Sequence, residues 1–275
     1  MKIRHHKLEK VEGEEVPFEK TPNVGGRLEP RLLVIHYTAG PGLEESVGWL
    51  CRKEARASAH LVIGRDGRVV QLAPFNRVTW HAGISRWNGV EGLNHHSIGI
   101  ELDNAGRLER KGGGEWTSWF GRTYPEEEVM EATHKHEVEE AGWQTFTPKQ
   151  LAVALEVSAG LVARYGLEEV VGHDDISPGR KVDPGPAFPL GSFRSRLLGR
   201  EQEEAPTLET TVNLNIRTGP GTEFERLDGS PLPSGTRVEV VDEAADWRLV
   251  DVLGDGEELP DLQGWVHGRY LQEHR

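Results

Sequence analysis

The sequence predicts an α/β core over roughly residues 25–198, followed by a small all-β barrel. In the first part, short apolar runs typical of strands alternate with helical patterns. A charged segment that ends in proline, residues 200–206, separates the two parts. After it, several short strand patterns follow at close spacing with no helical period, which is typical of a small barrel.

Four segments of the first part carry strand signals. Residues 32–37, LLVIHY, form a short apolar run that ends in Thr-Ala-Gly, and residues 97–102, SIGIEL, alternate. Residues 60–70 hold two apolar runs around Asp-Gly, a strong hairpin signal. Residues 170–172, VVG, predict a further short strand or strand end. Such runs predict buried strands, whose ends present side chains to a cleft.

Helical spacing of apolar residues predicts a helix over 43–57 and another over 147–165. The second has Thr at its cap, Pro in its first turn and Gly at its end. Residues 126–141 show weak helical periodicity, and the Gly-rich, aromatic residues 104–124 predict a long loop. Residues 174–189 hold four prolines and predict a rigid loop.

Composition narrows the class of protein. The 275 residues are 36% hydrophobic and 28% charged, as in globular proteins. No apolar run approaches the roughly 18 residues of a membrane span. The first 30 residues contain no apolar h-region, so we expect cytoplasmic synthesis without a secretory signal in the chain as given. Cys51 is the single cysteine, which rules out an intrachain disulfide.

The chain is acidic, with a net charge of −13. This charge is a poor match for nucleic acid. Residues 207–275 hold six Arg, no Lys and 14 Asp plus Glu, a net charge of −8. Most of the excess therefore lies in the last quarter of the chain, which supports a separate domain there.

Two histidines and one aspartate lie at the kinds of position, strand ends and a rigid loop, where catalytic or metal-binding residues are expected. His36 and His173 each end an apolar run, and Asp183 follows in the Pro-rich loop. Two imidazoles and one carboxylate leave a fourth tetrahedral position open, as in hydrolytic zinc sites. From spacing alone the signal is weak, and three unremarkable surface residues remain the alternative.

Five ordered blocks add a specific resemblance: LLVIHYTAG, SAHLVIGRDGRVVQLAP, TWHAG, SIGIELDNAG and GHDDISPGRKVDPGPAFP. Over about residues 30–190 the chain resembles the zinc-dependent N-acetylmuramoyl-L-alanine amidases of the type-2 amidase family, which are related in fold to peptidoglycan recognition proteins. The resemblance implies a mixed central β-sheet flanked by helices. It also implies one Zn²⁺ per chain.

The resemblance places the zinc ligands at His36, His173 and Asp183. It places the catalytic glutamate at Glu101 and a lysine that supports the tetrahedral intermediate at Lys181. These residue types suit amide hydrolysis, since a carboxylate can carry a proton and a cation can stabilise a developing oxyanion. A solvent-facing glutamate and a surface lysine are the alternatives.

Further residues in or near these blocks are candidates for substrate binding, although each can equally be a packed structural residue. They are Tyr37, Trp80, His81, Asn94 and Arg180.

The tail resembles bacterial SH3-type (SH3b) domains in its N-x-R-x-G-P-G opening, residues 215–221, and in a late Gly-Trp-Val run. Such domains often dock enzymes on the cell wall, although a barrel that only stabilises its neighbour is an alternative. Trp247 and Trp265 can form an apolar slot or the core. The expected division is a lead-in segment wrapped on the surface over 1–30, a catalytic domain over 31–198, a linker over 199–207 and the SH3b domain over 208–275.

The resemblance implies cleavage of the amide bond between N-acetylmuramic acid and L-alanine. A peptidoglycan-binding protein without catalysis and a zinc peptidase acting on wall peptides are the alternatives. The substrate form stays open between anhydro-muropeptides in the cytoplasm and cell wall reached after release. We expect peptidoglycan or muropeptide as partner, with the cell wall bound through the SH3b domain, no nucleic acid and no membrane span.

Overall fold

The chain forms two compact units, residues 1–198 and 199–275. The computed structural model describes residues 2–11, 14–111, 115–199, 208–222, 224–253 and 262–273. Each unit has its own hydrophobic core. The expected linker lies outside the described residues except for Gly199.

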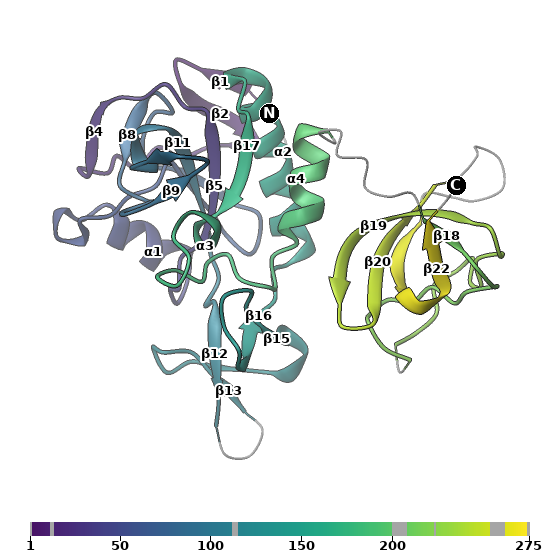
Figure 1. The fold of residues 1–275 in the computed structure, drawn as a ribbon. Coiled ribbons are helices and arrows are strands. Elements are labelled where there is room, and N and C mark those ends of the chain that lie inside the picture. The colour runs from purple at the N-terminus through teal and green to yellow at the C-terminus, as the bar shows by residue number, and fades with distance from the viewer. Residues whose placement is uncertain are drawn as a thin grey trace. The chain divides into compact units, whose positions relative to one another are not determined.

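A five-stranded sheet organises the first unit (Figure 1). Its strand order is β17 (Glu169–Gly172), β5 (Leu32–Tyr37), β11 (Ser97–Leu102), β6 (Leu61–Ile63) and β7 (Val69–Gln71). The first four strands are parallel, and β7 returns antiparallel to β6. The predictions of a mixed sheet, of these strands and of the hairpin are therefore confirmed.

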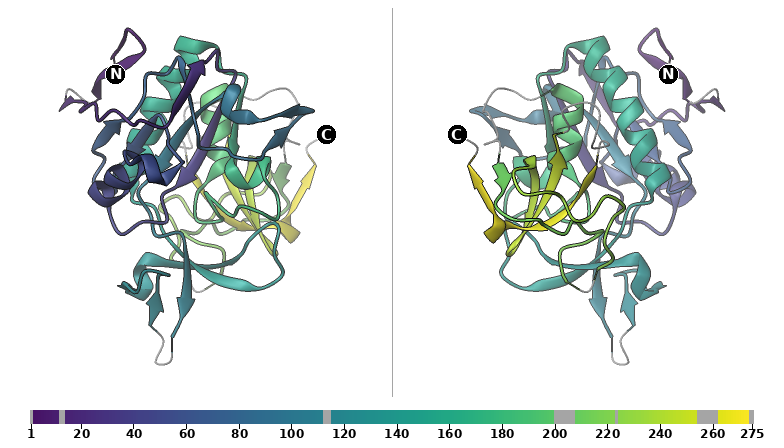
Figure 2. Two further views of the ribbon diagram at one scale, coloured as in Figure 1. Left: turned by 90° about the vertical axis from the view of Figure 1, so that its left-hand side faces the viewer. Right: turned by 90° about the vertical axis from the view of Figure 1, so that its right-hand side faces the viewer.

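The two faces of this sheet bury different residues. Leu33 and Ile35 of β5 join the core that also contains the apolar side of α2 (Pro148–Tyr165). Figure 2 shows α2 running along this face of the sheet, and α4 (Leu190–Leu198) packs against α2 and β17. Leu32 and Val34 pack on the opposite face. Because side chains alternate along a strand, His36 also belongs to that opposite face.

The helix predictions are confirmed in position and corrected in length. The side chain of Thr147 caps α2 by accepting a hydrogen bond from the backbone N–H of Gln150, and Gly166 ends the helix in a left-handed conformation. The helix expected over 43–57 is shorter: α1 (Leu43–Leu50) gives way to a 3₁₀ turn over Lys53–Ala55. Among the described residues, no helix is long and apolar enough to cross a membrane.

A second sheet occupies the region predicted as a long loop and a weak helix. Its strand order is β14 (Thr123–Tyr124), β13 (Trp116–Thr117), β12 (Arg107–Arg110), β16 (Glu140–Gln144) and β15 (Val129–Thr133). The predictions were wrong here. The strands are short and burial alternates poorly along them, so their sequence carries little periodic signal.

The N-terminal segment contributes to the core as well as to the surface. β1 (Lys2–Arg4), β2 (Lys7–Val11) and β3 (Glu14–Glu15) form a small sheet, and Leu8, Val11 and Leu28 are buried in the main core. Two short pairs complete the unit: β4 (Val24–Arg27) with β8 (Arg77–Thr79), and β9 (Arg86–Trp87) with β10 (Val90–Glu91).

The second unit is a small antiparallel β structure, as predicted. Its strand order is β21 (Gln263–His267), β20 (Trp247–Val252), β19 (Arg237–Ala244), β18 (Leu208–Thr210) and β22 (Leu271–Glu273). Residues 212–217 alternate as a strand would, but they form only isolated bridges at Leu214 and Arg217. Trp247 and Trp265 are both half-buried.

Candidate active site

His36, His173 and Asp183 come together at the ends of two neighbouring parallel strands. His36 lies near the end of β5, and His173 follows β17 as the first residue of the short helix α3 (His173–Ile176). Nδ1 of His36 lies 3.0 Å from Nδ1 of His173 and 2.9 Å from Oδ2 of Asp183. Nδ1 of His173 lies 3.0 Å from the same Oδ2. All three side chains are buried, and they form a group able to hold a metal ion.

The charges of the cluster favour a neutral His36 and an ionised Asp183. Burial and, to a smaller extent, the neighbouring His173 lower the pKa of His36 to about 4. Burial alone would raise the pKa of Asp183, but the two histidines His173 and His36 beside its carboxylate hold it well below its usual range. Neutral histidine and ionised carboxylate are the forms that bind divalent metals.

The hydrogen bond at Nε2 of His173 determines which nitrogen of its ring faces the cluster. Nε2 of His173 lies 3.1 Å from the carbonyl oxygen of Ala82, which can only accept a hydrogen bond. Nη2 of Arg180 lies farther from Nε2, at 3.4 Å, and donates to closer oxygen atoms of Ala82, Ile84 and Ser177. Nε2 therefore carries the hydrogen, and Nδ1 presents its lone pair toward Asp183. Tetrahedral zinc with bonds of about 2.0–2.1 Å to nitrogen separates its ligands by about 3.3 Å. The donors present therefore fit a zinc ion.

Glu101 and Lys181, called here the front of the cluster, interact electrostatically with its residues. Glu101 is paired with His36 in the register of β11 and β5, so both side chains belong to one face of the sheet. Oε2 of Glu101 is buried without a hydrogen-bond partner. Burial raises the pKa of Glu101 well above its ordinary value, Asp183 raises it further, and the positive charge of Lys181 opposes the shift.

Other predicted site residues lie behind or beside the cluster. Nδ1 of His81 lies 3.0 Å from Nε2 of His36. Oδ1 of Asn94 accepts hydrogen bonds from the backbone N–H groups of His81 and Ala82 at 3.0 and 2.7 Å. Nη2 of Arg180 donates to the carbonyl oxygens of Ala82 and Ile84 at 2.9 and 2.7 Å. These polar groups have partners within the protein, and their contact with substrate stays a prediction.

Two aromatic candidates differ in exposure. Trp80 is exposed, and its backbone N–H donates to Oγ of Ser58 at 2.9 Å. Tyr37 is half-buried and packs against the main core beside Gly106, where a Cβ would lie 2.3 Å from its ring. Both remain predictions as substrate contacts.

Sequence reasoning missed a support for the helix that carries His173. Nε2 of His134 lies 3.0 Å from Oδ2 of Asp174, and Nζ of Lys135 forms ion pairs with Asp174 and Asp175 at 3.0 and 2.6 Å. These contacts join the second sheet to α3. Because they span about 40 positions of chain, no local spacing could have indicated them.

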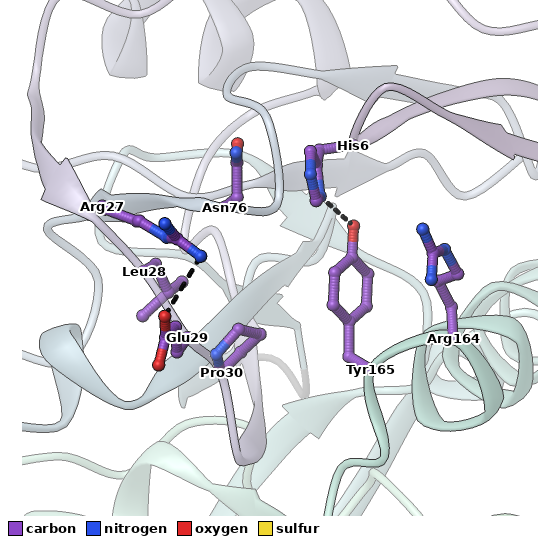
Figure 3. Close-up of a pocket in the computed structure, with 8 residues that line it drawn as sticks. All are labelled: His6, Arg27, Leu28, Glu29, Pro30, Asn76, Arg164 and Tyr165. Carbon is purple, nitrogen blue, oxygen red and sulfur yellow. Dashed lines mark hydrogen bonds and ion pairs between the residues drawn. The ribbon is translucent and has the colours of Figure 1, made fainter.

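A surface cavity of about 600 Å³ lies elsewhere in the first unit (Figure 3). None of the predicted site residues lines it. A hydrogen bond of 3.0 Å joins Nδ1 of His6 and the hydroxyl of Tyr165 on its wall, and Arg27 is paired with Glu29 at 3.2 Å. This cavity is therefore separate from the predicted site.

Two imidazoles and a carboxylate that converge beside a buried carboxyl group, on an α/β sheet, define the class of metal-dependent hydrolases. Comparison with known proteins narrows this class. Residues 26–186, more than half of the chain, match the N-acetylmuramoyl-L-alanine amidase family. The chain belongs to that family. Residues 212–272 match the bacterial SH3 domain family, so the resemblance of the tail is confirmed as well.

Individual relatives agree with this assignment. The chain is 34% identical over 178 residues to N-acetylmuramoyl-L-alanine amidase AmiD of Escherichia coli, covering 62% of this chain and 54% of that protein. It is 30% identical over 186 residues to 1,6-anhydro-N-acetylmuramyl-L-alanine amidase AmpD of Salmonella typhimurium, covering 61% and 80%. The chain thus spans about half the length of the first relative and most of the second.

Among solved structures, a selenomethionine derivative of AmpD resembles the chain with a TM-score of 0.50 and 26% identity. The similarity covers 72% of this chain and 99% of that one. It supports the fold of the first unit.

Proposed function

We propose that this protein is a zinc-dependent amidase that hydrolyses the bond between N-acetylmuramic acid and L-alanine. The observation that carries the proposal is the triangle of His36, His173 and Asp183, with the unpartnered carboxyl oxygen of Glu101 beside it. Membership of the amidase family supports the reaction. The proposed ligands are Nδ1 of both histidines and Oδ2 of Asp183, with one zinc ion per chain.

An amide is a poor electrophile, so the reaction needs an activated water molecule and a stabilised oxyanion. Bound zinc would supply both, by lowering the pKa of water and by polarising the carbonyl. The carboxylate of Glu101 takes the proton of the attacking water and returns it to the nitrogen of L-alanine as the carbon–nitrogen bond breaks. Nζ of Lys181 stabilises the negative charge on the carbonyl oxygen.

Lys181 is free for that task. Among the described residues, its side chain has no hydrogen-bond or ion-pair partner, although its charge acts on His36 and Glu101. Its backbone N–H is bound to the carbonyl oxygen of Ser177 at 3.1 Å, which fixes the loop that carries it. A positioned but unpaired cation is what oxyanion stabilisation requires.

Mass spectrometry of muropeptides before and after treatment tests the proposed reaction. We expect free stem peptides that begin with L-alanine, together with the sugar that still carries its lactyl group. Cleavage between two amino acids would instead identify a peptidase. Binding without products would identify a recognition protein.

The substrate form divides into two proposals. The relative AmpD is named as a 1,6-anhydro-N-acetylmuramyl-L-alanine amidase, which favours small anhydro-muropeptides in the cytoplasm. The SH3 domain favours intact cell wall, which the enzyme would reach after release. We propose that the SH3 unit binds wall and raises the local concentration of the first unit there.

Comparing the full chain with a truncated chain of residues 1–200 tests the role of the SH3 unit. The two units have separate hydrophobic cores, so we expect the shortened chain to fold. It should cleave soluble muropeptides at about the full-length rate and lose about tenfold or more on polymeric wall. Equal losses on both substrates would show that the SH3 unit acts on the first unit itself. Equal rates on both would exclude wall targeting.

A further inference from the structure

A chain of buried hydrogen-bonding groups lies behind His36, on the side away from Asp183. Nε2 of His36 lies 3.0 Å from Nδ1 of His81. Nε2 of His81 lies 3.2 Å from Oγ of Ser97 and 3.4 Å from the carbonyl oxygen of Ser97. Oγ of Ser97 lies 2.6 Å from the carbonyl oxygen of Leu93. All of these side chains are buried.

The direction of each hydrogen bond can be assigned by starting from the last group of this chain, the carbonyl oxygen of Leu93. The carbonyl oxygen of Leu93 can only accept, so the hydroxyl hydrogen of Ser97 points to it. Oγ of Ser97 then offers a lone pair to His81, as does the carbonyl oxygen of Ser97. Nε2 of His81 faces two acceptors and must carry the hydrogen. Nδ1, the other nitrogen of the His81 ring, faces Nε2 of His36.

In its contact with His81, Nε2 of His36 is the donor. In the zinc site of the proposed function, Nδ1 of His36 binds the metal and carries no hydrogen, so the N–H of this imidazole is at Nε2. Nδ1 of His81 accepts this hydrogen bond, with 3.0 Å between the two nitrogens. The contact thereby holds the lone pair of Nδ1 of His36 toward His173 and Asp183.

The backbone around His81 is shaped to hold its ring. A Cβ on Gly99 would lie 2.4 Å from Cγ of His81, so the ring fits over β11 because residue 99 is glycine. Asn94 fixes the backbone N–H of His81. The next residue, Ala82, accepts the hydrogen bond from Nε2 of His173. One short segment thus contacts both histidines of the cluster from behind.

We propose that His81 is a positioning residue, which holds His36 in the tautomer and orientation that bind zinc. The inference rests on the zinc site of the proposed function. It assigns His81 a role through His36 in place of contact with substrate. Partners of this kind raise the affinity of a metal site by about 10–100-fold.

Zinc dissociation constants, measured by competition with a chelator of known affinity, test the inference. His81→Leu should bind zinc about 10–100-fold more weakly than the wild-type protein. His81→Asn should restore most of this loss, because its amide oxygen lies as many bonds from Cβ as Nδ1 of histidine and can accept the same hydrogen bond. Zinc binding by His81→Leu at wild-type affinity would overturn the inference.

His60→Leu is the matched control. His60 is also buried, and its ring centroid lies 6.1 Å from that of His81. Its nitrogens bind the carbonyl oxygen of Arg77 and the backbone N–H of Gly99, with no contact to a proposed ligand. This variant should keep its zinc affinity within about threefold. An equal loss in both variants would reduce the role of His81 to general packing and overturn the proposal.

Two further measurements keep the result independent of folding and of the proposed function. If His81→Leu does not fold, Gly99→Ala displaces the same ring without removing a polar group and should also weaken zinc binding. In the zinc-loaded wild-type protein, nitrogen NMR should show His81 protonated at Nε2, with a scalar coupling from its Nδ1 to Nε2 of His36; a proton on Nδ1 of His81 would contradict the proposal. Failure of the wild-type protein to bind zinc would instead overturn the proposed function.

Discussion

The back and the front of the metal cluster are built in opposite ways. Behind it, Nε2 of His36 and Nε2 of His173 each have a hydrogen-bond partner within the protein. In front, the buried Oε2 of Glu101 has none, and neither does the side chain of Lys181 among the described residues. The two histidines therefore need no ligand to complete the hydrogen bonds at the back, whereas the groups at the front lack hydrogen-bond partners.

This difference separates two tasks. Satisfied hydrogen bonds fix the direction of the imidazoles, and buried polar groups without partners are costly unless a ligand completes them. Changes at the front should therefore alter turnover while leaving zinc affinity and stability intact. Changes at the back should alter stability or zinc affinity while turnover at saturating zinc stays near normal.

Glu101→Gln should give the largest effect at the front. The amide cannot accept the proton of water, so turnover on muropeptides should fall by about 10²–10⁴-fold. Zinc content, measured by elemental analysis, should stay at one ion per chain. Glu109→Gln, on the exposed part of β12, is the control and should keep its rate. A near wild-type rate for Glu101→Gln would place the base elsewhere.

Lys181→Ala should lower turnover by about 10²–10³-fold, since it removes the cation that we propose stabilises the developing oxyanion. Its zinc affinity should remain that of the wild-type protein. Lys20→Ala changes an exposed lysine and serves as the control. If Lys181→Ala also lost zinc, the residue would belong to the metal site. The front and the back would then not have separate tasks.

Asn94→Ala should give the smallest effect on turnover, within about threefold at saturating zinc, because it acts at the back. It removes the acceptor for two backbone N–H groups, so the free energy of unfolding should fall by about 1–3 kcal/mol. Denaturant titration measures this loss. Asn76→Ala alters an amide on the wall of the cavity in Figure 3 and should cost less. A large loss of turnover with unchanged stability would show that Asn94 contacts substrate.

The sequence predicted the parts of the molecule that have a strong period or a specific motif. The parallel strands around His36 and Glu101 are continuous apolar runs, and α2 has clear capping residues, so both were predictable. Residues 107–144 were not, because their strands are short, and the pairing of β12 with β16, which joins the sheet, links segments distant in sequence. Long-range pairing overrides such weak local patterns.

In the candidate site, too, local sequence patterns did not predict contacts between distant segments. Family blocks pointed to the residues at the front and also marked His81 and Arg180, with Asn94 just before another block, without indicating that these groups bind other protein groups. The contacts of His81 with His36 and Ser97 join three separate segments, so they depend on the fold. A sequence motif can indicate that a residue lies near a site, but the role of that residue depends on the groups it contacts in the folded protein.

Anomalous X-ray diffraction at the zinc edge, on crystals of the zinc-loaded protein, would identify the atoms that bind the metal. We expect a single strong peak within bonding distance of Nδ1 of His36, Nδ1 of His173 and Oδ2 of Asp183, with Nε2 of His36 still hydrogen-bonded to His81. Zinc bound through Nε2 of either histidine, or at another place in the chain, would contradict it.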